Sequence, residues 1–285
     1  MEERLRKTVI ALAHEIGSRS YREPDALGRA SGYIKGMFEE QGYDVYSQIF
    51  RVGGQAYENI SAEVRGISGR TVIVGAHYDS VSGTPGADDN ASGVAAVLEL
   101  SGLLRQASFG NTVRFVAFTL EEPTFFRTQY MGSHVYARSL REKGEDVIGM
   151  ICLEMIGFFT DRPRSQYFPV SLMRWFYPHT GNFISMVSDL RSKGFLSRVL
   201  AGFRKGTSLS VEHVSTLPIV PGIDFSDHRS FWQFGYDAVM ITDTSFYRNP
   251  NYHGESDTYD TLDYVKMAEV VRGLESAIRE IAAAD

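Results

Sequence analysis

The chain has 285 residues and a mass of 31.9 kDa, which is enough for one large α/β domain or two small ones. Its hydrophobic and charged fractions, 43% and 22%, are those of a globular protein and exclude a disordered, collagen-like or coiled-coil chain. The formal net charge of −6 leaves no excess of basic side chains to neutralise a phosphate backbone, so we expect no nucleic-acid partner.

The spacing of apolar residues predicts helices and strands that alternate along the chain. The predicted helices lie at residues 5–16, 27–38, 92–104, 133–143, 196–203 and 262–281. The predicted strands lie at residues 45–50, 60–64, 71–75, 113–118, 147–153 and 238–242. Ser226 is predicted to cap a further short helix that stops at Gly235.

Buried strands that alternate with helices are typical of an α/β sheet covered on both faces. We therefore predict a single-domain, three-layer sandwich over residues 1–285, with a mixed, mostly parallel central sheet. No repeat and no Pro- or Gly/Ser-rich linker divides the chain. Residues 158–182 are rich in proline and aromatic side chains, and we expect them to form an irregular excursion near the active face.

The sequence carries no pattern of a membrane or secretory segment. Its longest stretch without a charged residue, 175–188, is too short and too polar to span a bilayer. Residues 1–7 have mixed charge and lack the apolar core of a secretory signal. We therefore expect a cytoplasmic protein without membrane contact, unless a leader has been removed. The single cysteine, Cys152, is expected to be an inert buried thiol, and no pattern indicates a particular oligomeric state.

Histidine and carboxylate side chains follow the predicted strands at the point where each strand ends. In chain order they are His77, Asp79, Asp89, Glu121, Glu122, Glu154 and His253. In open α/β sheets the ligand sites form at the carboxyl ends of the strands. We therefore expect these groups to converge in space, although they are far apart in the sequence.

Convergent histidines and carboxylates without cysteine suit a divalent ion of borderline hardness, with zinc as the first choice and cobalt or manganese as substitutes. Asp89, Glu122 and Glu154 together carry three negative charges. Two divalent cations and one bridging hydroxide would neutralise them, whereas a single cation would leave the carboxylates to repel one another. The ligand set therefore predicts two ions.

Six motifs occur in an order that resembles peptidase family M28, the co-catalytic zinc aminopeptidases. They are His77-Tyr-Asp79-Ser, Gly86-Ala-Asp-Asp89-Asn-Ala-Ser-Gly93, Glu121-Glu122, Leu153-Glu154-Met-Ile-Gly157, Ser226-Asp-His228 and Tyr252-His253. The resemblance extends from about Thr71 to Asp263. It implies a zinc exopeptidase fold and a dinuclear zinc enzyme that hydrolyses the N-terminal peptide bond of peptides with a free N-terminus.

The resemblance also implies a role for each matched position. The ligands of two Zn²⁺ ions would be His77, Asp89, Glu122, Glu154 and His253. Among these, Asp89 would bridge the ions, and in the family a cis peptide often follows this residue. Glu154 stands where many relatives have aspartate, which is one methylene shorter. Asp79 would orient the His77 imidazole, and Asp227 is expected beside the site.

The implied reaction is metal-assisted amide hydrolysis. The bridging hydroxide would attack the scissile carbonyl, with Glu121 as general base and then as general acid. Tyr252 would polarise the substrate carbonyl. The net negative charge that remains with Glu121 ionised would attract a free α-ammonium group, which favours chain termini as substrates.

Three alternatives remain open from the sequence. A glutaminyl cyclase-like acyltransferase with a single zinc would form N-terminal pyroglutamate, although such enzymes typically have Trp where Tyr252 stands. A carboxypeptidase of the same family would need cations for the terminal carboxylate, and only Arg127 and Arg248 are candidates. A metal-binding protein without turnover is disfavoured by the intact Glu121.

Aromatic residues flank the motifs and form either core or the wall of an apolar side-chain pocket. They are Phe125, Phe126, Tyr130, Phe158, Phe225 and Tyr247.

Overall fold

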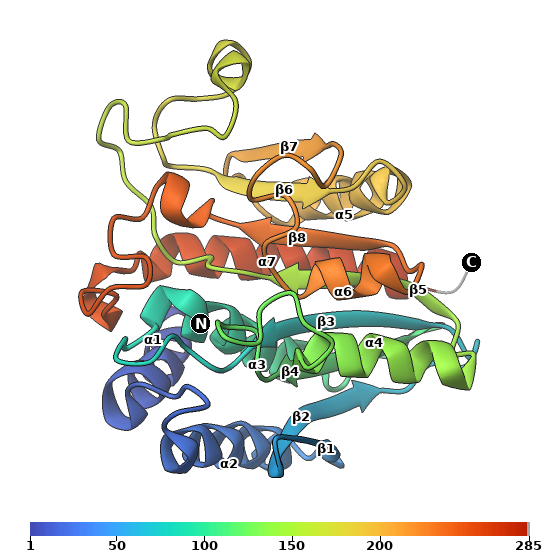
Figure 1. The fold of residues 1–285 in the computed structure, drawn as a ribbon. Helices are drawn as coiled ribbons and strands as arrows, with labels where there is room; N and C mark the ends of the chain where they lie inside the picture. The colour runs from blue at the N-terminus through green and yellow to red at the C-terminus, as the bar shows by residue number, and fades with distance from the viewer. Residues whose placement is uncertain (284–285) are drawn as a thin grey trace.

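The computed structural model describes residues 1–283, and these contain one sheet of eight strands in the order β1-β2-β4-β3-β5-β8-β6-β7 (Figure 1). The strands are β1 (Tyr46–Val52), β2 (Gln55–Val64), β3 (Thr71–His77), β4 (Thr112–Phe118), β5 (Val147–Leu153), β6 (Ile184–Ser188), β7 (Val211–Ser215) and β8 (Ala238–Thr242). Strands β4, β3, β5 and β8 run parallel in the centre, and β1, β2, β6 and β7 pair with their neighbours at the two edges. The contacts β1–β2, β2–β4 and β8–β6 are antiparallel, so the predicted mixed, mostly parallel sheet is confirmed.

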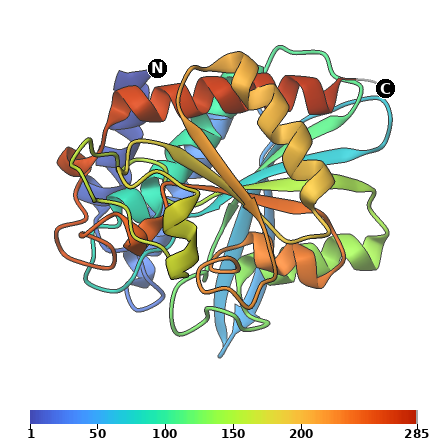
Figure 2. The same ribbon diagram turned by 90° about the horizontal axis from the view of Figure 1, so that it is seen from above.

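Helices cover both faces of this sheet, which gives the predicted three layers. They are α1 (Glu2–Ile10), α2 (Pro24–Glu40), α3 (Gly93–Leu104), α4 (Gly132–Lys143), α5 (Lys193–Gly206), α6 (His228–Gln233) and α7 (Tyr264–Ala282). Shorter helical turns lie at Ala11–Ile16, Ala87–Ser92, Ser171–Trp175, Ser245–Tyr247 and Tyr259–Thr261. Helices α5 and α7 cross one face, and α4 and α6 lie against the other (Figure 2).

The central strands are buried on both sides, as a parallel sheet between helices requires. Along β3, Val72 and Val74 point into the larger core, which contains side chains of α3, α5 and α7. The intervening residue Ile73 points into the smaller core beneath α4 and α6. Among residues 1–283, no helix combines the length and the apolar composition needed to cross a bilayer.

Two strands, β6 and the edge strand β7 beside it, were not predicted. Strand β6 is only five residues long and two of these are serines, and β7 contains Glu212 and His213 in a half-exposed segment. Neither segment has the continuous apolar run that identifies a buried strand from sequence, so their pairing to the sheet decides their structure. The predicted cap at Ser226 is wrong. Asp227 precedes α6, and the Ser226 hydroxyl instead donates a hydrogen bond to the Oε2 atom of Glu154 at 2.6 Å.

Residues 158–183 form an arm that extends away from the helices and the sheet (Figure 1). Its regular structure is the helical turn Ser171–Trp175, which buries none of its residues, and Trp175 is 84% exposed. The predicted irregular excursion is therefore confirmed. The arm is attached at its base, where the backbone N–H of Tyr167 donates to the carbonyl of Tyr247.

Candidate metal centre

The structure brings the predicted ligands together at the carboxyl ends of the central strands. His77 is the last residue of β3, Glu121 and Glu122 follow β4, and Glu154 follows β5. The two remaining groups come from Asp89, in the helical turn before α3, and from His253, in the loop after β8. All are buried except His253, whose side chain is 31% exposed and lies at the mouth of the site.

The side chains form two groups that share one carboxylate. The Nε2 atom of His77 lies 3.4 Å from Oδ1 of Asp89 and 3.3 Å from Oε2 of Glu154. The Nε2 atom of His253 lies 3.1 Å from Oδ2 of Asp89 and 3.3 Å from Oε2 of Glu122. Each oxygen of Asp89 therefore faces a different histidine, as a bridging ligand requires.

These distances fit metal coordination. Tetrahedral zinc with bonds of about 2.0 Å holds its ligand atoms about 3.3 Å apart, close to the separations in both groups. The Nδ1 atom of His77 lies 3.1 Å from the carbonyl oxygen of Asp79, so a proton on Nδ1 leaves Nε2 with a lone pair. That lone pair faces carboxylates, which is favourable only if a cation lies between them. Within residues 1–283, neither Nε2 of His77 nor Oε1 of Glu122 has a hydrogen-bond partner.

The pKa values of these groups are shifted by burial and by the charges packed around them. Burial alone would lower the pKa of His77, but the charges of Glu154 and Glu121 hold it well above its usual value. Burial also acts to lower the pKa of His253. Its hydrogen bonds to Asp89 and Glu122 outweigh this effect and raise the pKa to about 10. Burial raises the pKa of Glu122 to about 8, and the charge of Asp89 adds to the effect. Without metal, protons must therefore supply the positive charge that the centre needs.

Glu121 lies farther from the histidines than the other carboxylates do. Its Oε2 atom is 3.9 Å from Nε2 of His77. Burial is the main cause that raises the pKa of Glu121 well above the usual range of a carboxyl group, and the charge of Glu122 contributes. His77, Glu121 and Glu122 do form a third cluster within ligand distance, but the contacts through Asp89 are shorter. This geometry leaves Glu121 free for a proton-transfer role.

Two aspartates fix the backbone beneath the predicted ligands. Asp79 accepts hydrogen bonds from the backbone N–H groups of Glu121 and Glu122, at 3.2 and 3.1 Å, while its Oδ1 atom lies 3.6 Å from Nδ1 of His77. Asp257 accepts from the backbone N–H of Asp89 at 3.1 Å. Asp257 was missed by the sequence reasoning, because no pattern in residues 254–263 links it to a segment so distant in the chain.

Neighbouring motif residues position the loops. The Asp89–Asn90 peptide is cis, as the resemblance implies, and the Asn90 side chain bonds to the backbone of Leu153 and Met155 on either side of Glu154. Asp88 points away from the centre and accepts from the Gly157 N–H, so it does not join either group.

Asp227 lies near the centre but contacts no predicted ligand through a hydrogen bond. Both of its oxygens are buried without a partner within residues 1–283. Burial raises the pKa of Asp227 to about 7, while the charge of His77 acts in the opposite direction. The hydrogen bond to a predicted ligand comes instead from the preceding residue, Ser226.

Arg19 is a second buried group that the sequence did not reveal. Its guanidinium is fully buried and donates to the carbonyls of Tyr78, Pro85 and Gly86, which belong to the loop between His77 and Asp89. Burial lowers the pKa of Arg19 to about 10, although nearby carboxylates, of which Asp257 contributes most, raise it. Arg19 therefore remains charged at neutral pH and supports the loop from below.

Tyr252 lies at the mouth of the centre. Its ring stacks on the His253 imidazole, with 3.7 Å between the ring centroids. Burial and the charges of Asp89 and Glu122 raise the pKa of Tyr252 far above its usual value. The phenol therefore stays protonated and is a hydrogen-bond donor at any physiological pH.

Comparison with known proteins identifies the family. Residues 59–277 match the sequence model of peptidase family M28. The chain belongs to this family. The predicted ligands from His77 to His253 all lie within the matched part of this M28 chain.

Two relatives illustrate how far the similarity extends. The M28 chain is 45% identical over 280 residues to YfbL of Escherichia coli K12, an uncharacterised protein, with 95% of this chain and 86% of YfbL covered. It is 29% identical over 276 residues to a probable leucine aminopeptidase of Trichophyton verrucosum. This match covers 90% of the M28 chain and 66% of the fungal protein. The chain thus spans slightly less than two thirds of the length of the fungal relative.

Solved structures share the fold. A zinc aminopeptidase from Bacillus subtilis superimposes with a TM-score of 0.80 over 99% of this chain and 95% of its own, at 16% identity. A glutaminyl cyclase from Fimbriiglobus ruber superimposes with a TM-score of 0.71 over 98% of this chain and 95% of the cyclase, at 19% identity. Both comparisons confirm the predicted fold class, and at such identities neither distinguishes hydrolysis from cyclisation.

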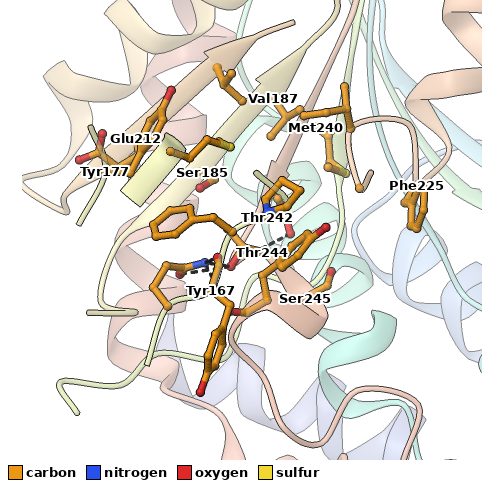
Figure 3. Close-up of a pocket in the computed structure, with 18 of the residues that line it drawn as sticks. Tyr167, Tyr177, Ser185, Val187, Glu212, Phe225, Met240, Thr242, Thr244 and Ser245 are labelled. Atoms are coloured by element: carbon orange, nitrogen blue, oxygen red, sulfur yellow. Dashed lines mark hydrogen bonds between the residues drawn. The ribbon is translucent and has the colours of Figure 1, made fainter. Parts of the chain in front are cut away.

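A mainly apolar pocket lies beside the metal centre, between the arm, the ends of β6, β7 and β8, and the loop before α6 (Figure 3). Phe225 and Tyr247, two of the aromatic residues expected to form such a wall, line it. Phe246 connects the pocket to the centre, because its ring packs 6.0 Å from Phe225 and 5.4 Å from Tyr252. The other candidate wall residues, Phe125, Phe126, Tyr130 and Phe158, do not line this pocket.

Proposed function

We propose that this M28 chain is a dinuclear zinc aminopeptidase, which hydrolyses the N-terminal peptide bond of peptides with a free N-terminus. The observation that carries the proposal is the shared carboxylate of Asp89, whose two oxygens face His77 and His253 at ligand distance. One ion would be held by His77, Asp89 and Glu154, and the other by Asp89, Glu122 and His253.

When bound, two Zn²⁺ ions would supply Lewis acidity for the scissile carbonyl and lower the pKa of water from 15.7 toward about 7. Glu121 accepts a proton from the attacking water and returns it to the leaving amine. Its burial suits this exchange, because burial raises the pKa of Glu121 and so makes the carboxylate a stronger base. Tyr252 donates a hydrogen bond to the carbonyl oxygen as negative charge develops on it.

Substrate orientation follows from the charge around the centre. Carboxylates outnumber the cationic side chains there, so a free α-ammonium group is attracted and a carboxylate is repelled. The apolar pocket beside Tyr252 would receive the side chain of the N-terminal residue, with Phe225 and Phe246 against it.

Within residues 1–283, neither arginine that the carboxypeptidase alternative needs is available to a substrate carboxylate. Arg127 forms an ion pair with Asp224, which a second arginine, Arg229, also contacts. Arg248 is buried beneath the base of the arm, where it donates to the side-chain oxygen of Gln166 and the carbonyl of Phe183. Arg127 is therefore paired and Arg248 is held inside the protein, which supports an aminopeptidase.

The glutaminyl cyclase alternative is separated by one assay. Zinc-loaded protein is incubated with an aminoacyl anilide in one sample and an N-terminal glutamine peptide in another, and released amine and pyroglutamate are measured. The proposal expects amine release from the first and no pyroglutamate from the second. Exclusive pyroglutamate formation would support the cyclase and contradict the proposal.

The number of ions is tested separately. Apoprotein is titrated with Zn²⁺ by calorimetry, and bound metal is counted by elemental analysis. We expect two ions per chain and one ion in the His253→Ala variant, because that substitution removes a ligand from only one group. A single ion in the active wild-type protein would overturn the dinuclear assignment.

A further inference from the structure

The sheet ends in β1 on one side and in β7 on the other, and the two edges are protected to different degrees (Figure 1). Soluble proteins keep foreign strands from an exposed edge by short edge strands, charged side chains and covering loops. The β7 edge has all three features. This strand is only five residues long, it carries Glu212, and the Tyr177 hydroxyl of the arm donates to the carbonyl of His213.

The β1 edge is open to a further strand. Strand β1 is seven residues long, contains no proline or lysine, and pairs with β2 in an unbroken register. In an antiparallel pair every second residue turns its N–H and C=O groups away from the partner. Within residues 1–283, no segment other than β2 forms backbone hydrogen bonds with β1. Ile49, in the middle of β1, is 67% exposed, and Tyr46, at its start, is 46% exposed.

The sequence of β1 fits a second copy of itself in the antiparallel direction. Pairing over all seven residues places Ile49 opposite Ile49, Tyr46 opposite Val52 and Ser47 opposite Arg51. Each of these unlike pairs then occurs twice about a two-fold axis, as a closed dimer requires. No like charges face each other in this register, and the apolar residue at its centre meets its own equivalent.

Charges at the two ends of β1 favour the same register. Extended by two residues, the pairing places Asp44 of one copy opposite Gly54 of the other, one strand spacing of about 4.8 Å away. Arg51 donates to the carbonyl of Gly54 at 2.9 Å, so its guanidinium lies where the second copy brings Asp44. Asp44 and Arg51 are both exposed, and neither forms an ion pair within the described part of the chain, residues 1–283. The two-fold arrangement therefore creates two pairs of opposite charges.

We propose that two copies of this chain form a dimer through antiparallel pairing of their β1 strands, which joins the two sheets into one. The two-fold axis passes beside Ile49, and each Ile49 side chain covers the other. Ile49 also lies on the rim of a groove between α2 and the β1–β2 hairpin, which Leu27 and Tyr57 line as well. A second copy therefore gains apolar contacts at this rim in addition to backbone hydrogen bonds, while Asp44 and Arg51 select the register.

A single cysteine at the two-fold axis tests the register. Directly opposed Cα atoms in an antiparallel pair lie about 4.5–5.5 Å apart, which is within the range for a disulfide, so Ile49→Cys should link the two copies. The natural Cys152 is buried and does not compete. After mild oxidation, non-reducing electrophoresis should show mostly linked dimer for Ile49→Cys. The control Ile67→Cys, at a site that is 89% exposed, should stay largely unlinked, and equal linking of the two variants would contradict the register.

Sedimentation equilibrium tests the dimer itself, and it does not depend on enzymatic activity. The wild type should have twice the chain mass of 31.9 kDa. Ile49→Lys places two like charges directly opposite each other and removes the apolar contact, so the Kd of the dimer should rise about tenfold or more. Because Ile49 is mostly exposed, the variant should keep its fold by circular dichroism, and Ile67→Lys should remain a dimer. A monomeric wild type, or an Ile49→Lys dimer as tight as the wild type, would overturn the inference.

Discussion

The carboxylate of Asp257 accepts a hydrogen bond from the backbone N–H of Asp89, although 168 positions separate the two residues. Its other oxygen accepts from the N–H of Asp88 at 2.9 Å. This pair of hydrogen bonds fixes the peptide that carries the proposed bridging ligand. The loop after β8 therefore provides His253 and also positions Asp89, so it links both proposed metal sites.

The Asp257→Asn variant should bind zinc more weakly. An amide offers one acceptor oxygen in place of two, so one N–H of the Asp88–Asp89 segment loses its partner and Asp89 is held less firmly. Loss of a group that orients a ligand typically reduces metal affinity 10–100-fold. Competition with a chromogenic chelator measures the effect. Asp260→Asn, an exposed substitution in the same segment, is the control, and equal affinities in the two variants would refute the role of Asp257.

The Glu121→Gln variant should keep its metal and lose turnover. Glutamine preserves the size of the side chain but cannot accept and return a proton, so kcat should fall by about 10²–10⁴-fold or more. Glu122→Gln should instead reduce metal content, because Glu122 lies within ligand distance of His253. Elemental analysis and steady-state kinetics on both variants separate the two effects. Near-normal kcat in Glu121→Gln would show that another group is the base.

The metal-free protein should lose stability as pH rises from about 4 to about 8. Burial raises the pKa values of Glu122 to about 8, Asp227 and Asp257 to about 7, and Asp243 to about 6. In the unfolded chain these groups titrate near pH 4, so across this interval the folded state binds more protons. By linkage, the free energy of unfolding then falls as pH increases.

One buried group opposes this trend between pH 4 and 6.5. Burial lowers the pKa of His228 to about 4, so the unfolded chain binds the extra proton there, but four carboxyl groups outweigh one histidine. Urea unfolding of chelator-treated protein at pH 5 and pH 8 measures the difference. Zinc should reduce it, because a bound cation stabilises the ionised form of Glu122. Metal-free protein that is more stable at pH 8 would contradict the pKa shifts.

The sequence was sufficient to predict the central sheet and the metal centre, because the residues that form them belong to recognisable local patterns. Each predicted ligand ends a strand, follows one or precedes a helix, and the topology of an α/β sheet brings strand ends together. Glu154 also fits, although its side chain is longer than the usual aspartate. The structure orients it by the Ser226 hydroxyl and brings its Oε2 atom as close to His77 as Asp89 comes.

Groups whose partners lie far away in the chain were missed. Asp257 and Arg19 occur in polar segments without periodicity, and their partners are backbone groups of distant loops. No property of either residue alone distinguishes it from an exposed charge. The alignment of Thr242, Ser185 and Glu212 across β8, β6 and β7 was also hidden, because it depends on the pairing of β6 and β7, two strands without a continuous apolar run.

Arg19 provides the last test, because its contribution to stability should be large for a single residue. The Arg19→Met variant removes the charge and leaves the carbonyls of Tyr78 and Pro85 without this donor, while the Gly86 carbonyl still accepts from the Ala91 N–H. Each unpaired group costs about 1–3 kcal/mol, so the loss of two pairings should lower the free energy of unfolding by at least about 2 kcal/mol. Arg19→Lys should recover part of the loss, since an ammonium group reaches fewer of the acceptors. Urea denaturation measures both variants against Arg162→Met, an exposed arginine in the arm that should change stability by less than about 0.5 kcal/mol. If Arg19→Met were as stable as Arg162→Met, the carbonyls would have found other partners and the loop before Asp89 would not depend on Arg19.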